Sequence, residues 1–152
     1  MTNHTFSTWG SWVPGRGQVQ PDTLPTELAP GRPLKAFMGW DGLFIHDESV
    51  NLVDMVWAYM EQARRESCGQ CFSCRLATEK ICGILEKICA GEGSPSDLDR
   101  IEVLARTMMT TARCDIGQTS PRPLLDLLQY RRDAFLRVIQ SRTAVSRGNY
   151  AL

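Results

Sequence analysis

The chain has 152 residues, of which 43% are hydrophobic, and this is enough for one modest core. Lysine plus arginine and aspartate plus glutamate number 17 each, so the formal net charge is zero and a nucleic-acid binder is disfavoured. No uninterrupted apolar run approaches the roughly 20 residues that a bilayer-spanning helix needs.

The first 35 residues are rich in proline and glycine and show little periodicity, so they cannot build a core of their own. Phe6, Trp9 and Trp12 lie in this segment, and aromatic side chains on an extended arm are typical anchors for a partner surface. We therefore expect residues 1–35 to form an extended arm that docks to a partner. A disordered tail with incidental aromatic residues is the alternative. Short extended pieces are expected over residues 34–45.

From residue 49 onward the pattern becomes helical. Apolar residues recur at helical spacing after Ser49, which is the predicted N-cap, and the first helix is expected to end near Ser67. A second helix is expected over residues 73–90, where Gly91 provides a C-terminal stop signal.

Two further helices are expected. Ser94 is the predicted cap of the third, with Pro95 at its first helical position, and the fourth should run over residues 123–141. Four amphipathic helices predict an all-α four-helix bundle over residues 36–141, followed by a C-terminal tail over residues 142–152. The apolar stripes alone carry no chemistry.

Four of the six cysteines stand in a three-plus-one pattern. Cys68, Cys71 and Cys74 form a Cys-x-x-Cys-x-x-Cys run, and Cys114 follows 40 residues after the last of them, in the loop expected after the third helix. A short, tightly turning backbone can aim three sulfurs at one centre while a distant cysteine supplies the fourth corner. This arrangement indicates an iron-sulfur cluster.

Other uses of these cysteines are less consistent with the spacing. Zinc sites usually present two separated ligand pairs, and a disulfide framework is not expected in a chain of this size without a secretory signal. Buried, inert thiols explain three cysteines within seven residues poorly. Among clusters, the plant-type and bacterial ferredoxin spacings are both absent, since Asp115 rather than proline follows Cys114. A 4Fe-4S cluster with a distant fourth ligand fits best, with zinc as the remaining alternative.

The residues next to these cysteines suggest how such a site is tuned. Gly69 is expected to let backbone amides approach the sulfides, because it has no side chain and tolerates a positive φ. Arg75 and Arg113 adjoin the predicted ligands and would offset part of the negative charge of a cluster, although a solvated surface charge is an equal alternative. Cys82 and Cys89 fall on the apolar face of the second helix and are predicted to be core residues.

The cysteine motif and its surroundings resemble the C-terminal iron-sulfur domain of the NADH-binding flavoprotein subunit of respiratory complex I and of related NAD-linked formate dehydrogenases and hydrogenases. The resemblance covers about residues 36–138. It is carried by three runs: Gly42-Leu43-Phe44-Ile45-His46-Asp47-Glu48-Ser49, Glu66-Ser67-Cys68-Gly69-Gln70-Cys71-Phe72-Ser73-Cys74-Arg75 and Cys114-Asp115-Ile116-Gly117.

The resemblance implies that Cys68, Cys71, Cys74 and Cys114 bind the iron of a 4Fe-4S cluster that receives electrons from a nearby flavin. This sequence differs from the usual pattern of that family in two ways. The usual Arg-x-Gly-Thr after the triplet is here Arg75-Leu76-Ala77-Thr78, which suggests that the turn passes directly into a helix. Only about 35 residues precede the matching region, so no flavin or NAD site is expected on this chain.

The sequence contains no catalytic constellation. The histidines are His4 and His46, and neither a serine elbow nor a phosphate loop is present. We therefore expect a non-catalytic electron-transfer subunit of a multi-subunit cytoplasmic oxidoreductase, related to formate dehydrogenases or hydrogenases. Its expected partners are a flavin- or NAD(P)H-binding subunit and further iron-sulfur or catalytic subunits, with no nucleic acid and no membrane span. The alternative is a non-redox interaction or assembly module stapled by a cluster or zinc.

Overall fold

The computed structural model describes residues 6–10, 12, 27–33, 35–46 and 50–145. This part of the chain is mostly helical, as predicted, and small sheets precede the helices. The helices are α1 (Leu52–Glu66), α2 (Phe72–Cys89), α3 (Pro95–Thr111), α4 (Asp115–Thr119), α5 (Arg122–Tyr130) and α6 (Arg132–Ser141). The strands are β1 (Phe6–Ser7), β2 (Glu27–Ala29), β3 (Arg32–Pro33), β4 (Ala36–Gly39) and β5 (Gly42–Ile45).

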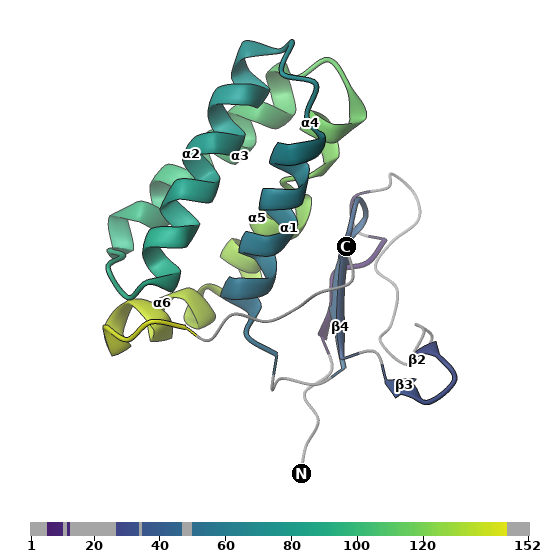
Figure 1. The fold of residues 1–152 in the computed structure, drawn as a ribbon, viewed down its shortest axis with the longest axis vertical. Helices are drawn as coiled ribbons and strands as arrows, with labels where there is room; N and C mark the ends of the chain where they lie inside the picture. The colour runs from purple at the N-terminus through teal and green to yellow at the C-terminus, as the bar shows by residue number, and fades with distance from the viewer. Residues whose placement is uncertain (1–5, 11, 13–26, 34, 47–49, 146–152) are drawn as a thin grey trace.

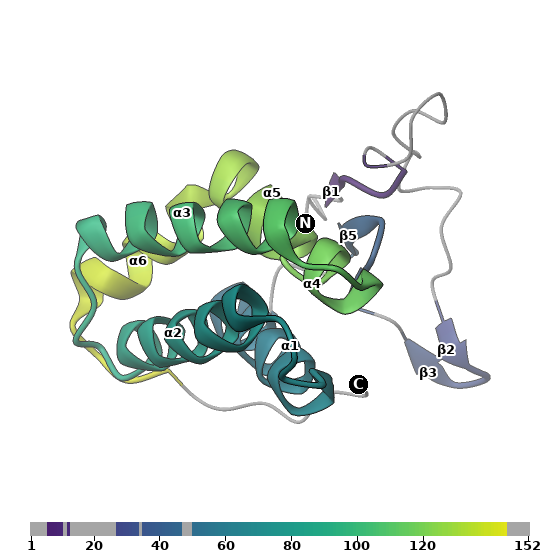
Figure 2. The same ribbon diagram turned by 90° about the horizontal axis from the view of Figure 1, so that it is seen from above.

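The long helices pack in two layers around one apolar core. Helix α2 packs against both α1 and α3, and α6 crosses the ends of α1, α2 and α3 (Figures 1 and 2). The centre of the core is formed by side chains that are almost fully buried, among them Val56, Met60, Ile81, Leu85, Ile88, Leu98, Ile101, Met108, Leu124 and Phe135. The apolar stripes read from the sequence therefore face this core, as expected for amphipathic helices.

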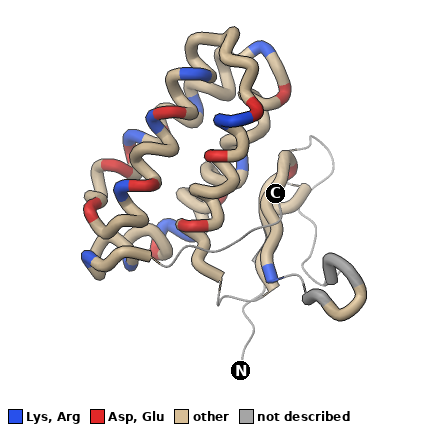
Figure 3. Tube along the Cα trace, in the orientation of Figure 1, with Lys and Arg blue, Asp and Glu red and all other residues tan. Residues whose placement is uncertain are grey.

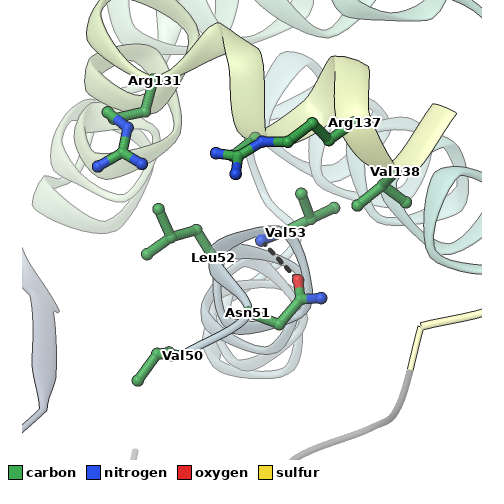
Figure 4. Close-up of a pocket in the computed structure, with 8 residues that line it drawn as sticks. Val50, Asn51, Leu52, Val53, Arg131, Arg137 and Val138 are labelled. Atoms are coloured by element: carbon green, nitrogen blue, oxygen red, sulfur yellow. Dashed lines mark hydrogen bonds between the residues drawn. The ribbon is translucent and has the colours of Figure 1, made fainter. Parts of the chain in front are cut away.

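Helix α1 begins at Leu52 and is capped by Asn51 rather than by the predicted Ser49, which lies outside the described residues. The Asn51 side-chain oxygen accepts a hydrogen bond from the backbone N–H of Val53 at 3.1 Å (Figure 4). It accepts another from the backbone N–H of Asp54, also at 3.1 Å. Asparagine and serine are comparable caps, so residue type alone could not choose between the two positions. The predicted end of the helix at Ser67 is confirmed.

The ends of α2 and α3 follow their local signals. Helix α2 stops before Ala90, and Gly91 adopts a φ of +83°, the left-handed conformation that terminates helices. Helix α3 starts at Pro95, and the Ser94 N–H donates to the Asp97 side chain at 3.0 Å. The predicted start of the third helix is therefore confirmed.

The predicted continuous fourth helix is wrong. Residues 122–141 form two helices that meet at Arg131, whose backbone is non-helical with φ −129° and ψ 38°. Helix α6 then buries Phe135 and Ile139 and contacts α1, α2, α3 and α5. The bend directs those side chains into the shared core, so the architecture differs from a simple four-helix bundle.

Two antiparallel sheets account for the extended residues. One has the strand order β1-β5-β4, with Phe6 opposite Ile45 and Phe37 opposite Phe44, and the other is the hairpin β2-β3. The first sheet lies beside α1 and α5 (Figure 1). The predicted extended pieces over residues 34–45 are thus the hairpin β4-β5, joined by a strand from within the N-terminal 35 residues.

The described part of the N-terminal segment contacts the chain's own sheet and helices. The Thr8 hydroxyl and the Trp12 indole N–H donate to one carboxylate oxygen of Asp126 on α5, at 2.6 and 2.9 Å. The Trp9 ring packs edge-on against Phe37 and Phe44 at centroid separations of 5.6 and 6.1 Å. Docking of residues 1–35 to another protein stays a prediction.

Charged residues of both signs are interspersed along the helices (Figure 3). Several form ion pairs within the chain, including Arg132 with Asp99 at 2.8 Å and Arg137 with Asp133 at 2.7 Å. Among the described helices, none combines the length and the apolar character that a membrane span requires.

Candidate metal centre

Two loops at one end of the helices bring the three-plus-one cysteines together. The loop between α1 and α2 carries Cys68 and Cys71, and the loop between α3 and α4 carries Cys114 at the same end (Figure 1). Both loops line one open pocket of about 510 Å³. Its lining residues are Cys68, Gln70, Cys71, Phe72, Ser73, Thr111, Arg113 and Cys114.

Cys74 lies behind this pocket in the first turn of α2 and is 3% exposed. Its Sγ is 3.4 Å from the Ser67 hydroxyl oxygen and would be 3.5 Å from a Cβ atom at Gly117 of α4. The sulfur therefore abuts the short helix that begins directly after Cys114. The four predicted ligands lie in one neighbourhood, with Cys74 on the buried side.

The other three predicted ligands lie nearer to solvent than Cys74. Cys68 and Cys114 are exposed, and Cys71 is half-buried at the N-cap position of α2. The thiols of Cys68, Cys71 and Cys114 can thus be reached from the open side of the pocket.

Gly69 adopts the backbone conformation that was expected of it, with a φ of +74°. Its N–H donates to the Ser67 hydroxyl at 3.3 Å, and the same hydroxyl lies beside the Cys74 sulfur. Because a side chain at this φ would be strained, glycine permits the tight turn between Cys68 and Cys71. Ser67 is a residue that sequence reasoning missed as part of the site, although it directly precedes the cysteine motif.

Helix α2 begins at Phe72, within the cysteine triplet, and continues through the Arg75-Leu76-Ala77-Thr78 run, as that run predicted. The Thr78 hydroxyl donates to the carbonyl of Cys74 at 2.8 Å, which is a hydrogen bond between successive turns. The start of α2 therefore holds Cys74 on rigid backbone. This lowers the number of orientations that its sulfur can take.

Gly117 lies inside α4 and is buried. A Cβ atom at this position would clash with the Cβ atom of Ala112 and would touch the Cys74 sulfur. Glycine is needed here for close approach between α4 and the end of α3, and not for an unusual φ.

Arg75 and Arg113 are both exposed, and Arg113 lines the cysteine pocket. Within the described part of the chain, neither arginine takes part in an ion pair. Their proposed effect on the charge of a bound cluster stays a prediction.

Cysteine thiolates are donors for both zinc and a 4Fe-4S cluster, and the two kinds of site differ in how far apart the sulfurs stand. Four zinc-bound sulfurs would lie about 3.8 Å apart, from the Zn–S distance and tetrahedral geometry. Among the residues that the structure describes, no group of three or more histidine, cysteine, aspartate or glutamate side chains is placed as a metal site. In a 4Fe-4S cluster each cysteine binds a different iron, so its four sulfurs stand farther apart around a larger centre, as an open pocket between two loops allows.

Cys82 and Cys89 are buried in the core, as predicted, with 5% and 1% exposure. Burial, together with the neighbouring Glu61 carboxylate, raises the pKa of Cys82 to about 12. A thiol with this pKa stays protonated at neutral pH, so Cys82 is a poor metal ligand and a poor nucleophile.

His46 is not among the described residues that line the cysteine pocket. The His46 ring contacts Phe44 with a centroid separation of 5.2 Å, whereas His4 lies outside the described residues. The expected lack of a catalytic constellation stays a prediction.

Comparison with known proteins places this geometry in a family. Residues 54–138 match the model of the NADH-ubiquinone oxidoreductase-F iron-sulfur binding region. The match includes all four cysteines of the three-plus-one pattern.

Similar proteins include the NADP(+)-dependent formate dehydrogenase subunit beta of Moorella thermoacetica, 37% identical over 97% of this chain and 21% of that protein. The NADP-reducing hydrogenase subunit HndC of Solidesulfovibrio fructosivorans is 34% identical over 62% of this chain and 19% of that protein. This chain thus spans about a fifth of the length of the curated relatives it matches.

Among solved structures, an H2-reduced NAD+-reducing [NiFe]-hydrogenase has a chain that aligns with a TM-score of 0.59 and 29% identity, over 63% of this chain and 17% of the other. The family model covers more than half of the 152 residues, and Cys68, Cys71 and Cys114 of the matched region line one pocket. The chain therefore belongs to the family of the NADH-ubiquinone oxidoreductase-F iron-sulfur binding region, whose cofactor is a 4Fe-4S cluster.

Proposed function

We propose that this chain relays single electrons through one 4Fe-4S cluster held by Cys68, Cys71, Cys74 and Cys114. The donor and acceptor would be a flavin-bearing, NAD(P)H-reacting subunit and a further redox subunit of a formate dehydrogenase-like or hydrogenase-like complex. The observation that carries this proposal is the pocket lined by Cys68, Cys71 and Cys114 in front of the buried Cys74. The names of the similar formate dehydrogenase and hydrogenase subunits support the kind of complex.

The cysteines would divide the work of holding the cofactor. The Cys74 side chain is held in place by its contact with Ser67 and by the close packing of α4 at Gly117. Cys68 and Cys114 lie on the exposed side, where a partner can approach. When bound, a 4Fe-4S cluster supplies reversible one-electron transfer at a potential set by burial, hydrogen bonds and nearby charge.

The arrangement favours a relay over a substrate-converting site. The cysteine pocket is lined by thiols, hydroxyls, an amide, an arginine and Phe72, with no carboxylate or imidazole among its described lining residues to move a proton. We propose that residues 36–141 act as the cluster-carrying unit, that residues 1–35 assist docking and that residues 142–152 form a tail. A cytoplasmic location is proposed because cluster thiolates persist in a reducing compartment.

Anaerobic purification followed by electron paramagnetic resonance tests this proposal. The dithionite-reduced protein should give the signal of a reduced 4Fe-4S cluster, and the signal should also appear with NAD(P)H once the flavin-bearing subunit is added. NAD(P)H alone should leave the isolated chain oxidised. A silent sample with stoichiometric zinc and no iron would contradict the relay and favour a non-redox assembly module.

A further inference from the structure

A second pocket, which we call the β4 groove, lies beside the cysteine loops. It has a volume of about 320 Å³ and runs between strand β4, the second half of α1 and the short helix α4. Phe37 and Met38 line it from β4, Tyr59 and Ala63 from α1, and Ile116 and Ser120 from α4 or its C-terminal end. More of its lining is apolar than polar, which is typical of a binding groove.

One wall of the groove is the free edge of a sheet. Strand β4 pairs with β5 on one side, and no described strand pairs with its other side. The His46 N–H donates to the Lys35 carbonyl at 2.7 Å, which makes Lys35 and His46 a hydrogen-bonded pair. Since such pairs alternate along antiparallel strands, Phe37 also bonds β5, while the backbone groups of Ala36 and Met38 point away from it.

The opposite wall contains a polar group without a partner. The Ser120 side chain is 5% exposed, and its hydroxyl forms no hydrogen bond with any described residue. The neighbouring Thr119 hydroxyl instead donates to the Asp115 carbonyl at 2.6 Å. A buried hydroxyl without a partner is unfavourable, so Ser120 is a group that an incoming ligand could satisfy.

The rim of the groove offers apolar anchors and one charge. Phe37 is 38% exposed and the adjacent Trp40 is 50% exposed, and both rings contact Trp9. At the end nearest the cysteine loops, the exposed carboxylate of Glu66 lines the groove. Exposed aromatic rings beside a free strand edge are typical of surfaces that bind an extended peptide segment.

We propose that the β4 groove binds an extended segment of the flavin-bearing subunit, which adds a strand to β4. Main-chain groups of that segment bond Ala36 and Met38, a polar group of it bonds the Ser120 hydroxyl, and a basic side chain faces Glu66. An apolar side chain covers Phe37 and Tyr59. The proposal rests on the proposed function, because it assumes that the chain works beside a flavin-bearing subunit.

This mode of binding would also set the distance for electron transfer. Glu66 and Ile116 line the groove, and each lies two residues from a predicted ligand, Cys68 and Cys114 respectively. A segment held in the groove therefore brings its own subunit close to the two loops that carry these cysteines.

Residue-resolved hydrogen exchange on the complex with the flavin-bearing subunit tests the strand pairing. The Ala36 and Met38 amides should exchange at least about tenfold more slowly in the complex, because they gain hydrogen bonds. The Phe37 amide already faces β5 and should change little. Unchanged exchange at Ala36 and Met38 in a formed complex would overturn the proposal.

A matched pair of variants tests the opposite wall. Ser120→Ala should weaken binding of the flavin-bearing subunit about fivefold, the usual scale for one hydrogen bond, without lowering the stability of the free chain. Thr119→Ala removes a hydroxyl that is bonded within α4 and should leave the affinity unchanged. Equal affinities for the Ser120→Ala variant and the unaltered chain would contradict a bound partner at this hydroxyl.

The outcomes separate this inference from the relay itself. If NAD(P)H reduces the chain through the flavin-bearing subunit while Ala36 and Met38 stay unprotected, the strand pairing is wrong and the relay stands. If the two amides are protected but no reduction occurs, the groove proposal holds and the relay fails. Protection by flavin or NAD(P)H alone would make the groove a small-molecule site and would overturn the bound strand.

Discussion

Asp126 joins the N-terminal segment to the helices through one buried carboxylate oxygen. It accepts hydrogen bonds from Thr8 and Trp12, and the Arg122 guanidinium lies 5.5 Å from the centre of the Trp12 ring. Burial raises the pKa of the Asp126 carboxyl above its ordinary value, although the two hydrogen bonds partly oppose this shift. The folded state therefore binds a proton at Asp126 more readily than the unfolded chain does.

The sign of this shift predicts a pH dependence. The contribution of Asp126 to stability is complete below the ordinary aspartate pKa and is lost as the pH rises through the raised value. Asp126→Asn keeps an oxygen acceptor but cannot ionise, so its stability relative to the unaltered chain should rise between acidic and neutral pH. Anaerobic urea unfolding at a series of pH values measures this difference, and a difference that does not vary with pH would contradict it.

Removing the acceptor altogether should be costly at any pH. Asp126→Ala leaves the Trp12 N–H without its partner and should destabilise the chain by about 1–3 kcal/mol. Asp133→Ala, which deletes an exposed carboxylate paired with Arg137, should change stability by no more than about 0.5 kcal/mol. Similar losses in both variants would mean that Asp126 does not hold the segment in place.

At the scale of single residues, the sequence predicts the features that depend on neighbouring residues in the chain. The cysteine triplet, the positive φ at Gly69 and the buried positions of Cys82 and Cys89 all follow from neighbouring residues. The contact between Thr8 and Asp126 spans 118 residues, and neither residue type signals a partner so far away. The unpartnered hydroxyl of Ser120 was missed for the same reason, because burial of a serine is decided by tertiary packing.

At the scale of elements, two helical glycines have opposite roles. A side chain at Gly117 in α4 would clash with Ala112, at the end of α3, whereas a Cβ atom at Gly83 in α2 would meet nothing within 4 Å. Glycine inside a helix costs about 0.5–1 kcal/mol relative to alanine unless it serves close packing.

The two glycines therefore predict opposite effects of the same substitution. Gly83→Ala should stabilise the chain by about 0.5–1 kcal/mol. Gly117→Ala should destabilise it by about 1–3 kcal/mol, since overpacking pushes α4 away from α3, and should lower cluster retention because Cys114 precedes α4. Thermal unfolding and iron analysis of both variants measure these effects, and a stabilising Gly117→Ala would show that the packing around α4 is looser than described.

Helix boundaries were predictable where a local signal exists. The capping residues before α3 and the glycine after α2 mark their positions in the sequence. The bend at Arg131 has no proline or glycine within residues 124–140, so the continuous apolar stripe suggested one helix. Burial of Phe135 and Ile139 against the other helices decides the bend, and this information is absent from a local pattern.

At the scale of the whole molecule, the helices act as a frame that brings two distant loops to one end. The packing of α2 against both α1 and α3 sets the loop of Cys68 and Cys71 at the same end as the loop of Cys114 (Figure 1). The sheet then adds a groove next to these loops. The motif predicts that the four cysteines lie near one another. The groove, in contrast, depends on how β4 meets α1 and α4.

The central claim is that Cys114 completes a set of four cysteines and that the core cysteines take no part. Iron analysis with electron paramagnetic resonance of anaerobically purified Cys114→Ser and Cys82→Ala variants tests it most directly. Cys82→Ala should keep about four iron atoms per chain and the signal of the unaltered protein, while Cys114→Ser should fall to about three iron atoms or fewer and lose or change the signal. Equal losses in the two variants, or full iron content in Cys114→Ser, would contradict the account.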